Sequence, residues 1–478
     1  MKGDFTRDTF NSHRHYTRVL AQQGRMQLDA DLNEQSAISQ HLLQTLAADL
    51  IGPHGGPLAN CGFKIISDAS TLNALTNDLG QPLPPDRLQE IKARLARGDF
   101  LIGQGRYYVH GRLAQCDTWT TYSEQLGYPF GEDTAVDNLL GVDNMLIYLD
   151  VWERHLAAAE RPELLDAALD GLDTSTRSEL VWQVKVSRGE TPRKCAHYQS
   201  LARERLPLLR AAARTPEKLD GKGEIYSEAR YRGAENRLYR IEIQRGGTAR
   251  AAAQSEGGAS FSWSRQNGSV LIRVLSHFFD GSATVLELAD FGPDGRTALT
   301  VGDWVQIVDD GSSLRGSPTP MLQVARVDSD KRTVSLTGFA DDTGRDPAMN
   351  PALRRWDHVV ADHSTGDAGA LLVREATDPD DAWIELEDGV SVQFLASTDG
   401  KPHDYRTGDY WLIPARTTIG AVLWPEETVD GSWLPMPRPP EGVSHHYAPL
   451  AIGSLSANGA WTFTRDCRHQ FSPMSSPV

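Results

Sequence analysis

Two periodicities of apolar residues divide the chain into a short helical start and a long β-rich remainder. Near the start, apolar residues recur at steps of three and four: Ile38, Leu42, Leu43, Leu46, Ala47 and Leu50. This spacing predicts one apolar face of a helix from about Asp31 to Leu50. Asp31 followed by Glu34 is typical of a helix N-terminus, and Gly52-Pro53 ends the pattern.

Two further stretches are predicted to be helical. Asp86 to Arg97 has a candidate N-cap at its start, an apolar stripe along one face, and Gly98 after its end. A second helix is expected from Tyr198 to Ala213, although Pro207 interrupts its backbone hydrogen bonds.

From about Gly233 onward the alternation has a period of two, which is typical of half-buried strands. Segments such as NRLYRIEIQRGG are bounded by Gly, Asp or Pro, and Asn267-Gly268 is a strong turn signal between strands. We therefore predict a mainly β protein with a few helices (α+β). It begins with an N-terminal arm and helix (1–55), followed by a mixed α/β region (56–232) and two β-sandwich or small-barrel modules (233–345 and 346–478).

Composition narrows the partners that the protein can have. The chain has 478 residues and a formal charge of −16, which argues against nucleic acid and against anionic lipid as partners. No run of about 18 apolar residues suggests a membrane span. The start, MKGDFTRDTF, has no apolar core of a secretory signal, so we expect synthesis and assembly in the cytoplasm, with an extracellular location if the protein belongs to a released particle.

Candidate metal, cofactor and catalytic residues do not form any complete motif. Asp29, Asp31 and Asn33 alternate like the start of a calcium loop, but Glu34 stands where that loop needs glycine. His13/His15, His445/His446, Cys195/His197 and Cys467/His469 each supply at most two zinc ligands, whereas a structural site needs four. We find no phosphate-binding glycine loop and no Gly-x-Ser-x-Gly, so we expect no cofactor, no metal and no catalytic residue.

The cysteines, tryptophans and paired acids are predicted to have structural rather than catalytic roles. Cys61, Cys116, Cys195 and Cys467 lie far apart, so we expect free thiols in a reducing compartment. Acidic pairs such as Asp309-Asp310 are interpreted as solvated turns. Four tryptophans within the strand pattern are expected to pack in the core rather than to form a sugar-stacking surface: Trp263, Trp304, Trp383 and Trp411.

The first 25 residues differ from the rest in charge. They hold five Lys or Arg and two Asp, a formal +3 (five minus two) within a chain of −16. Arginine and aromatic residues dominate the energetics of protein interfaces. The residues chosen as a candidate assembly interface are Phe5, Arg7, Phe10, Arg14, Tyr16 and Arg18. The alternative is that this arm folds back on its own acidic body.

Several phrases along the chain together resemble a bacterial family defined by a domain of unknown function. They are MKGDFTRDTF, HYTRVLAQQGRMQLDADLNEQ, YLDVWERHL, LDTSTRSELVWQVKV, ENRLYRIEIQ, FSWSRQNGSV, TGDYWLIPAR and HHYAPLAIGSL, and they extend from residue 1 to about residue 471. Members of that family are associated with phage-tail-like contractile injection systems. The resemblance provides no active-site residues.

The resemblance implies a structural, non-enzymatic subunit of such a particle: a component of the baseplate periphery, cage, fibre or cap. It would act through contacts with other subunits and as a homo-oligomer within the assembly. Two alternatives stay open. One is a surface module that binds a glycan or receptor, and the other is a particle-borne carbohydrate-active enzyme.

Overall fold

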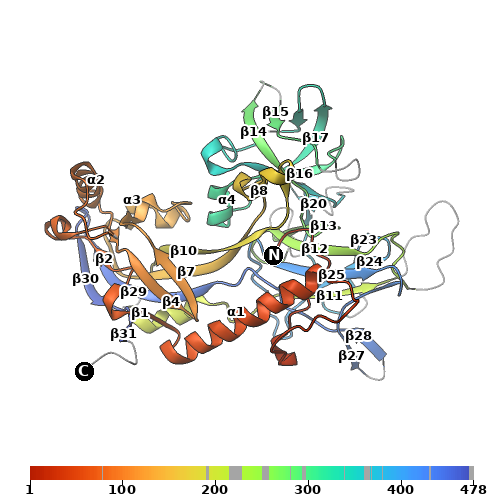
Figure 1. The fold of residues 1–478 in the computed structure, drawn as a ribbon, viewed down its shortest axis with the longest axis horizontal. Coiled ribbons are helices and arrows are strands. Elements are labelled where there is room, and N and C mark those ends of the chain that lie inside the picture. The colour runs from red at the N-terminus through yellow and green to blue at the C-terminus, as the bar shows by residue number, and fades with distance from the viewer. Residues whose placement is uncertain are drawn as a thin grey trace. The chain divides into compact units, whose positions relative to one another are not determined.

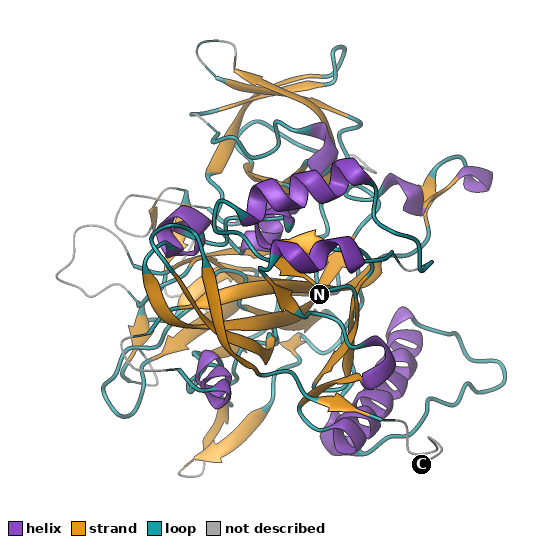
Figure 2. Ribbon diagram, turned by 90° about the vertical axis from the view of Figure 1, so that its left-hand side faces the viewer, coloured by secondary structure: helices purple, strands orange, loops and turns teal. Residues whose placement is uncertain are grey.

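The computed structural model shows a mainly β protein with few helices, as predicted (Figure 2). It describes all residues except 78, 190–192, 215–228, 250–257, 280, 282, 293–297, 339, 360–365, 368, 379–380, 430–431 and 473–478. The prediction left β-sandwich or small-barrel modules open, and the described sheets include a closed six-stranded barrel.

The described chain forms two compact units, each built from three separate ranges. Unit 1 comprises 1–8, 155–177 and 205–443, and unit 2 comprises 9–154, 178–204 and 444–478. The predicted segments were consecutive, whereas these units interleave along the chain.

Unit 2 contains two four-stranded sheets and most of the described helices. The first sheet has the order β31-β1-β4-β5: Gln470–Phe471, His54–Pro57, Gly105–Val109 and Arg112–Cys116. The second has the order β10-β7-β29-β30: Arg177–Ser187, Val142–Leu156, His446–Leu455 and Trp461–Asp466. A small three-stranded sheet joins β2 (Ile65–Ile66), β3 (Leu101–Ile102) and β6 (Thr120–Thr121). The helices are α1 (Asp29–Ile51), α2 (Pro85–Leu95) and α3 (Val136–Leu139).

Strand β7 separates two apolar layers of unit 2 because its side chains alternate between the faces of the sheet. Met145, Ile147, Leu149 and Val151 are buried in the larger core. On the other face, Leu146 packs with Tyr198 of the 3₁₀ helix η8 (Cys195–Leu201).

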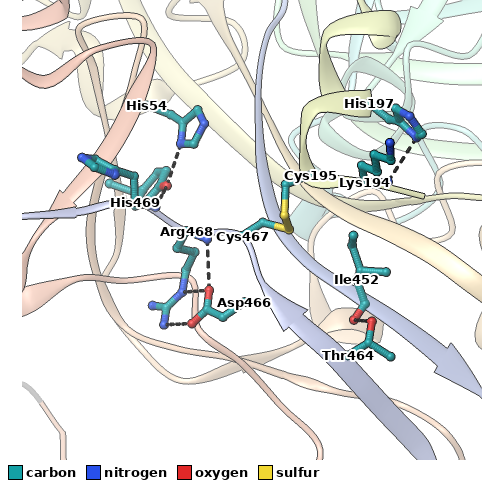
Figure 3. Close-up of a disulfide and its surroundings, with 11 residues drawn as sticks. His54, Lys194, Cys195, His197, Ile452, Thr464, Asp466, Cys467, Arg468 and His469 are labelled. Atoms are coloured by element: carbon teal, nitrogen blue, oxygen red, sulfur yellow. Dashed lines mark hydrogen bonds and ion pairs between the residues drawn. A yellow bond between two sulfur atoms is a disulfide. The ribbon is translucent and has the colours of Figure 1, made fainter. Parts of the chain in front are cut away.

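A disulfide attaches η8 to the segment that follows β30. Cys195 and Cys467 are bonded across 272 residues of sequence (Figure 3), while Cys61 and Cys116 are free. The prediction of four free thiols is therefore wrong for Cys195 and Cys467. A pair so far apart in sequence leaves no spacing signal.

Unit 1 contains two sheets packed face to face around one aromatic core. The larger sheet has the order β20-β21-β13-β12-β25-β26: Gly366–Asp367, Ala370–Leu372, Ser260–Ser264, Arg237–Arg245, Tyr410–Arg416 and Ala421–Val422. The other sheet pairs β24 (Val390–Leu395) with β11 (Leu208–Ala213), β22 (Glu375–Ala376) and β23 (Ile384–Glu387). Phe394 contacts Phe261 and Trp411 of the larger sheet, at ring-centroid distances of 5.1 and 5.8 Å.

Unit 1 also contains a closed six-stranded barrel, whose strands β14 to β17 are labelled in Figure 1. Around the barrel the strands are β14 (Leu271–Phe279), β15 (Thr284–Leu288), β18 (Thr333–Leu336), β17 (Met321–Asp328), β16 (Trp304–Val308) and β19 (Ala352–Trp356). Leucine, isoleucine and valine side chains fill its interior. Short elements complete the unit: α4 (Asp310–Arg315), β8 (Leu165–Asp166), β9 (Leu172–Asp173), β27 (Glu426–Val429) and β28 (Ser432–Pro435).

Two of the three predicted helices are confirmed as α1 and α2. The predicted cap of α1 is wrong in detail, because Leu28 occupies the N-cap and Asp31 is the third helical residue, where its carboxylate accepts from the Leu28 N–H at 3.4 Å. The helix predicted from Tyr198 to Ala213 is also wrong. Leu208–Ala213 pairs antiparallel with Val390–Leu395, a strand nearly two hundred residues away that local propensity cannot reveal.

The core assignments are only partly correct. Trp263 and Trp411 are buried, whereas Trp304 and Trp383 are half-buried. Asp309 and Asp310 are buried rather than solvated: Asp309 caps α4, and Asp310 forms an ion pair with Arg161 at 3.1 Å. A helix cap and a cation compensate the cost of burying these two carboxylates.

Candidate interaction surface

The first eight residues are anchored in unit 1. Lys2 pairs with Glu242 at 2.7 Å, and the backbone carbonyls of Met1 and Gly3 accept hydrogen bonds from the side chain of Asn267. Phe5 packs against the apolar side chains of β12 and β25. Phe5 and Arg7 are therefore half-buried in this chain, which agrees with the alternative that this part of the arm folds back.

Residues 9–28, called here the cationic segment, belong to unit 2 and run beside α1. Thr9 donates to Glu34 at 2.6 Å, the Val19 N–H donates to the Gln35 side chain at 2.8 Å, and the Phe10 ring lies 5.6 Å from that of His41. These contacts attach the segment to the helix. The segment contains Arg14, Arg18 and Arg25 and no acidic residue. Of the six candidate interface residues, Arg14, Tyr16 and Arg18 are exposed in this segment and Phe10 is half-buried.

Helix α1 contacts the rest of unit 2 through residues other than its leucines. Ala30 and Ile38 are its only buried side chains. The turn between β4 and β5 approaches the helix backbone closely, because a Cβ on Gly111 would lie only 2.0 Å from the Gln44 carbonyl oxygen. Gln40 donates to Glu153 of β7 at 2.9 Å. The helix thus contacts the body of unit 2 along one side.

The leucines of α1 lie on its opposite, solvent-exposed side. Leu32, Leu43, Leu46 and Leu50 are 60, 67, 56 and 62 % exposed. With Ser36 and Ser39 between them they form one continuous row, called here the leucine strip. Leu42 flanks the strip and is 50 % exposed. Leu43, Leu46 and Leu50 follow one another along the helix, and an exposed apolar patch of this kind is typical of a surface that another molecule covers.

The cationic segment also carries exposed apolar side chains. Tyr16, Leu20 and Met26 are 56, 68 and 85 % exposed. Tyr16 is among the candidate interface residues chosen from the sequence, whereas the leucines are not, because an apolar face at helical spacing does not show whether it lies inward or outward. The signal that could have identified them is the row Ala30, Ala37 and Ala47-Ala48, small residues that let the other side of α1 approach the protein body.

A cleft of about 370 Å³ is a separate feature of unit 2. It is lined by Asn77, Leu83, Arg87, Gln104, Asp117, Thr118 and Trp119. The indole N–H of Trp119 donates to the Thr76 carbonyl at 2.8 Å, which fixes the half-buried ring at the cleft. Arg87 pairs with Glu124 at 2.5 Å, so its charge is compensated within the protein.

The candidate metal ligands do not come together. Among the described residues, no group of three or more His, Cys, Asp or Glu side chains is arranged to hold a metal ion. His445 instead contacts Asp150 at 2.8 Å, and Lys185 binds the other oxygen of that carboxylate at 2.7 Å. Cys195 and Cys467 form the disulfide. No helix in the described part of the chain is long and apolar enough to span a bilayer.

Acid is expected to destabilise unit 2 through two of its histidines. Burial and the nearby charges of His469 and His110 lower the pKa of His54 to about 4. Burial, with Arg112 and His110, lowers the pKa of His446 to about 3. The unfolded chain binds these protons near pH 6.5 and the folded chain does not, so stability falls as the pH drops from 6.5 toward 4. We expect a loss of roughly 1–2 kcal/mol per histidine by pH 4.5, after allowance for solvent screening.

Denaturant unfolding at pH 7 and pH 4.5 measures this loss. The double variant His54→Gln/His446→Gln should show a clearly smaller difference between the two pH values. An equal difference in the variant and the original protein would show that other groups cause the acid sensitivity.

Comparison with known proteins identifies the family to which the chain belongs. The model of a family of unknown function, DUF6519, matches residues 1–200 and 190–477. Searches of curated proteins and of solved structures each found no match. Since the two matched ranges cover nearly the whole sequence, the chain belongs to the DUF6519 family.

Proposed function

We propose that this chain is a structural subunit that acts by association with other protein subunits through the leucine strip and the cationic segment. The observation that carries the proposal is the position of four leucines on the outer side of α1, each more than half exposed. Exposed leucines are common singly, but four on one side of a helix, three of them in succession, are not.

The chemistry of the surface specifies the partner. Further burial of each strip leucine contributes on the order of 1 kcal/mol, so the four together provide a useful part of a binding free energy. The neighbouring cationic segment adds three arginines without an acidic residue. The surface that covers the strip should therefore be apolar, and the surface that meets the cationic segment should carry carboxylates, whose charge complementarity would set the orientation of binding.

The kind of assembly comes from the resemblance of the sequence. A contractile, phage-tail-like particle is the assembly that the resemblance implies, with the chain in its baseplate periphery, cage, fibre or cap. Synthesis in the cytoplasm, and release only with the particle, belongs to the same proposal.

Replacing Leu46 with glutamate should remove the chain from its assembly. A charge in the middle of the strip cannot be buried against an apolar partner without a large desolvation cost. We expect the fraction of the chain in high-mass complexes to fall at least tenfold, measured by sedimentation of lysates from the producing cell.

Thr45→Glu is the matched control, since Thr45 is exposed on the same helix but lies outside the strip. It should leave sedimentation unchanged, and both variants should keep the thermal unfolding midpoint of the original protein. If Leu46→Glu sediments like Thr45→Glu, the strip has no role in assembly.

The Trp119 cleft supports a second function, the binding of a glycan. An aromatic ring beside amide, hydroxyl and carboxylate groups is the chemistry that neutral sugars require, and the cleft's volume lies in the range of small-molecule sites. Quenching of tryptophan fluorescence by a panel of defined oligosaccharides tests it. Binding that is lost in Asp117→Ala and Gln104→Ala would support a glycan site, and no saturable quenching by any oligosaccharide would exclude it.

A further inference from the structure

The leucine strip has the spacing of a helix that pairs with another helix. Leu32, Ser36, Ser39, Leu43, Leu46 and Leu50 follow one another at steps of four, three, four, three and four residues. This is the repeat of a coiled-coil seam, in which alternate steps of three and four keep one row of side chains facing a partner helix. A helix that lies in an irregular groove does not require so regular a row.

A second copy of the same helix fits the uncharged strip. The six residues of the strip carry no charge, and the acidic residues of α1, Asp29, Asp31, Glu34 and Asp49, lie outside it, near its two ends. Two copies of a chain with a charge of −16 repel each other on average, so they can meet most easily at a nearly neutral surface. An uncharged apolar strip is complementary to itself, as a two-fold interface requires, whereas the cationic segment is not.

The two serines of the strip already have their hydroxyl groups hydrogen-bonded within the helix. The Ser36 hydroxyl donates to the Leu32 carbonyl at 3.2 Å, and the Ser39 hydroxyl donates to the Gln35 carbonyl at 3.0 Å. Covering these side chains therefore leaves neither donor without an acceptor. Their small size also lets two helix backbones approach closely.

The order of large and small residues along the strip favours an antiparallel orientation of the two helices. In an antiparallel pair centred near residue 41, Leu32 meets Leu50, Ser36 meets Leu46, and Ser39 meets Leu43 of the second copy. Every small residue then faces a leucine, which fills each layer. A parallel pair would place Ser36 against Ser36 and Ser39 against Ser39, and would leave the middle of the seam poorly filled.

We propose that α1 forms an antiparallel two-fold pair with α1 of a second copy, through these layers. The proposal rests on the proposed function, because it names the partner of the leucine strip. The cationic segment stays available to a different, acidic subunit. The homodimer is thus the unit that enters the assembly.

Sedimentation equilibrium of the purified full chain tests the pairing. We expect a mass twice the 52.6 kDa of one chain at micromolar concentrations, at least a tenfold weaker association for Leu46→Glu, and no change for Thr45→Glu. A monomer at 50 µM, or a dimer that Leu46→Glu does not weaken, overturns the pairing.

Site-directed crosslinking tests the orientation. Two variants are made in a Cys61→Ser background, one with Ser39→Cys and the other with Leu43→Cys. Because residue 39 faces residue 43 in the antiparallel pair, oxidation of a mixture of the two variants should give a disulfide-linked dimer. Oxidation of either variant alone should give little of this dimer. Dimers that form mainly within each separate sample indicate a parallel pair and overturn the proposed register.

The failure of this inference can be distinguished from failure of the proposed function. The purified chain could be a monomer while Leu46→Glu is nevertheless lost from the high-mass complexes. That result would exclude the pairing but keep the strip as an assembly surface. A dimer dissociated by Leu46→Glu, with complexes unaffected, would keep the pairing but exclude its role in assembly.

Discussion

Replacing Glu242 with glutamine is expected to destabilise unit 1 by about 3–5 kcal/mol, the usual cost of removing one partner from a buried ion pair. Glu242 lies on β12 and is only 7 % exposed. Its carboxylate binds Lys2 and Arg240, and Arg354 lies near enough to add its charge. Glutamine keeps the shape of the side chain and removes only the negative charge.

The charges around Glu242 explain the size of the effect. Burial alone would raise the pKa of Glu242, but Lys2, Arg240 and Arg354 outweigh it and lower the pKa to about 2. Burial and the charge of Arg354 lower the pKa of Lys2 to about 7, since one carboxylate lies among three cations. Without Glu242, the half-buried Lys2 and the buried Arg240 lose the carboxylate that both of them bind.

Denaturant unfolding and hydrogen exchange measure the result together. Residues 1–8 should exchange faster in Glu242→Gln, because Lys2 helps to hold them on unit 1. Glu385→Gln is the matched control, since Glu385 is exposed on β23 and lies 3.8 Å from Arg232. The control should lower the free energy of unfolding by less than about 1 kcal/mol, because ion pairs at the surface contribute little to stability. Equal effects of the two substitutions would contradict the assigned role of Glu242.

Removing the disulfide is the other change with a large expected effect. The bond between Cys195 and Cys467 closes a loop of 272 residues, and the loss of such a crosslink costs about 3–5 kcal/mol. Cys195→Ser should also release η8 from the face of the sheet where Tyr198 packs on Leu146 and Ile452. We expect a lower thermal unfolding midpoint and easier proteolysis near η8.

Cys61→Ser is the matched control, because Cys61 is one of the two free cysteines. It should unfold like the original protein, while Cys195→Ser unfolds earlier. Thiol titration of the denatured, unreduced protein gives a second measurement. Two reactive thiols per chain would agree with the structure, and four would show that the disulfide is absent.

Local patterns predicted the elements whose signals are local. The apolar steps of α1 and α2 located both helices to within a few residues, although their N-caps are Leu28 and Pro84 rather than the predicted Asp31 and Asp86, and the alternation after residue 233 indicated the β-rich class. The spacing in α1 predicted one apolar face that held Ile38 together with the leucines, but Ile38 is buried while Leu42, Leu43, Leu46 and Leu50 are exposed. It could not tell whether that face meets the body of the same chain or another molecule, because both situations require the same periodicity.

The strand pairing, the disulfide and the ion pair that local patterns did not predict each join residues far apart in the chain. Leu208–Ala213 is a strand only because Val390–Leu395 lies beside it, and Cys195 is oxidised only because the fold brings Cys467 to it. Lys2 lies in the cationic arm, for which docking to another subunit and folding back on the body were both left open, and the fold places Glu242 of β12 within 2.7 Å of it. Pairings across such distances carry no signal in the local spacing of residues.

A photocrosslinking amino acid placed at position 46 of α1, in the producing cell, tests the central claim most directly. If the leucine strip is an assembly surface, irradiation should give crosslinks between chains at position 46 and few at position 45. Equal yields at the two positions, or products formed only within one chain, would contradict the claim.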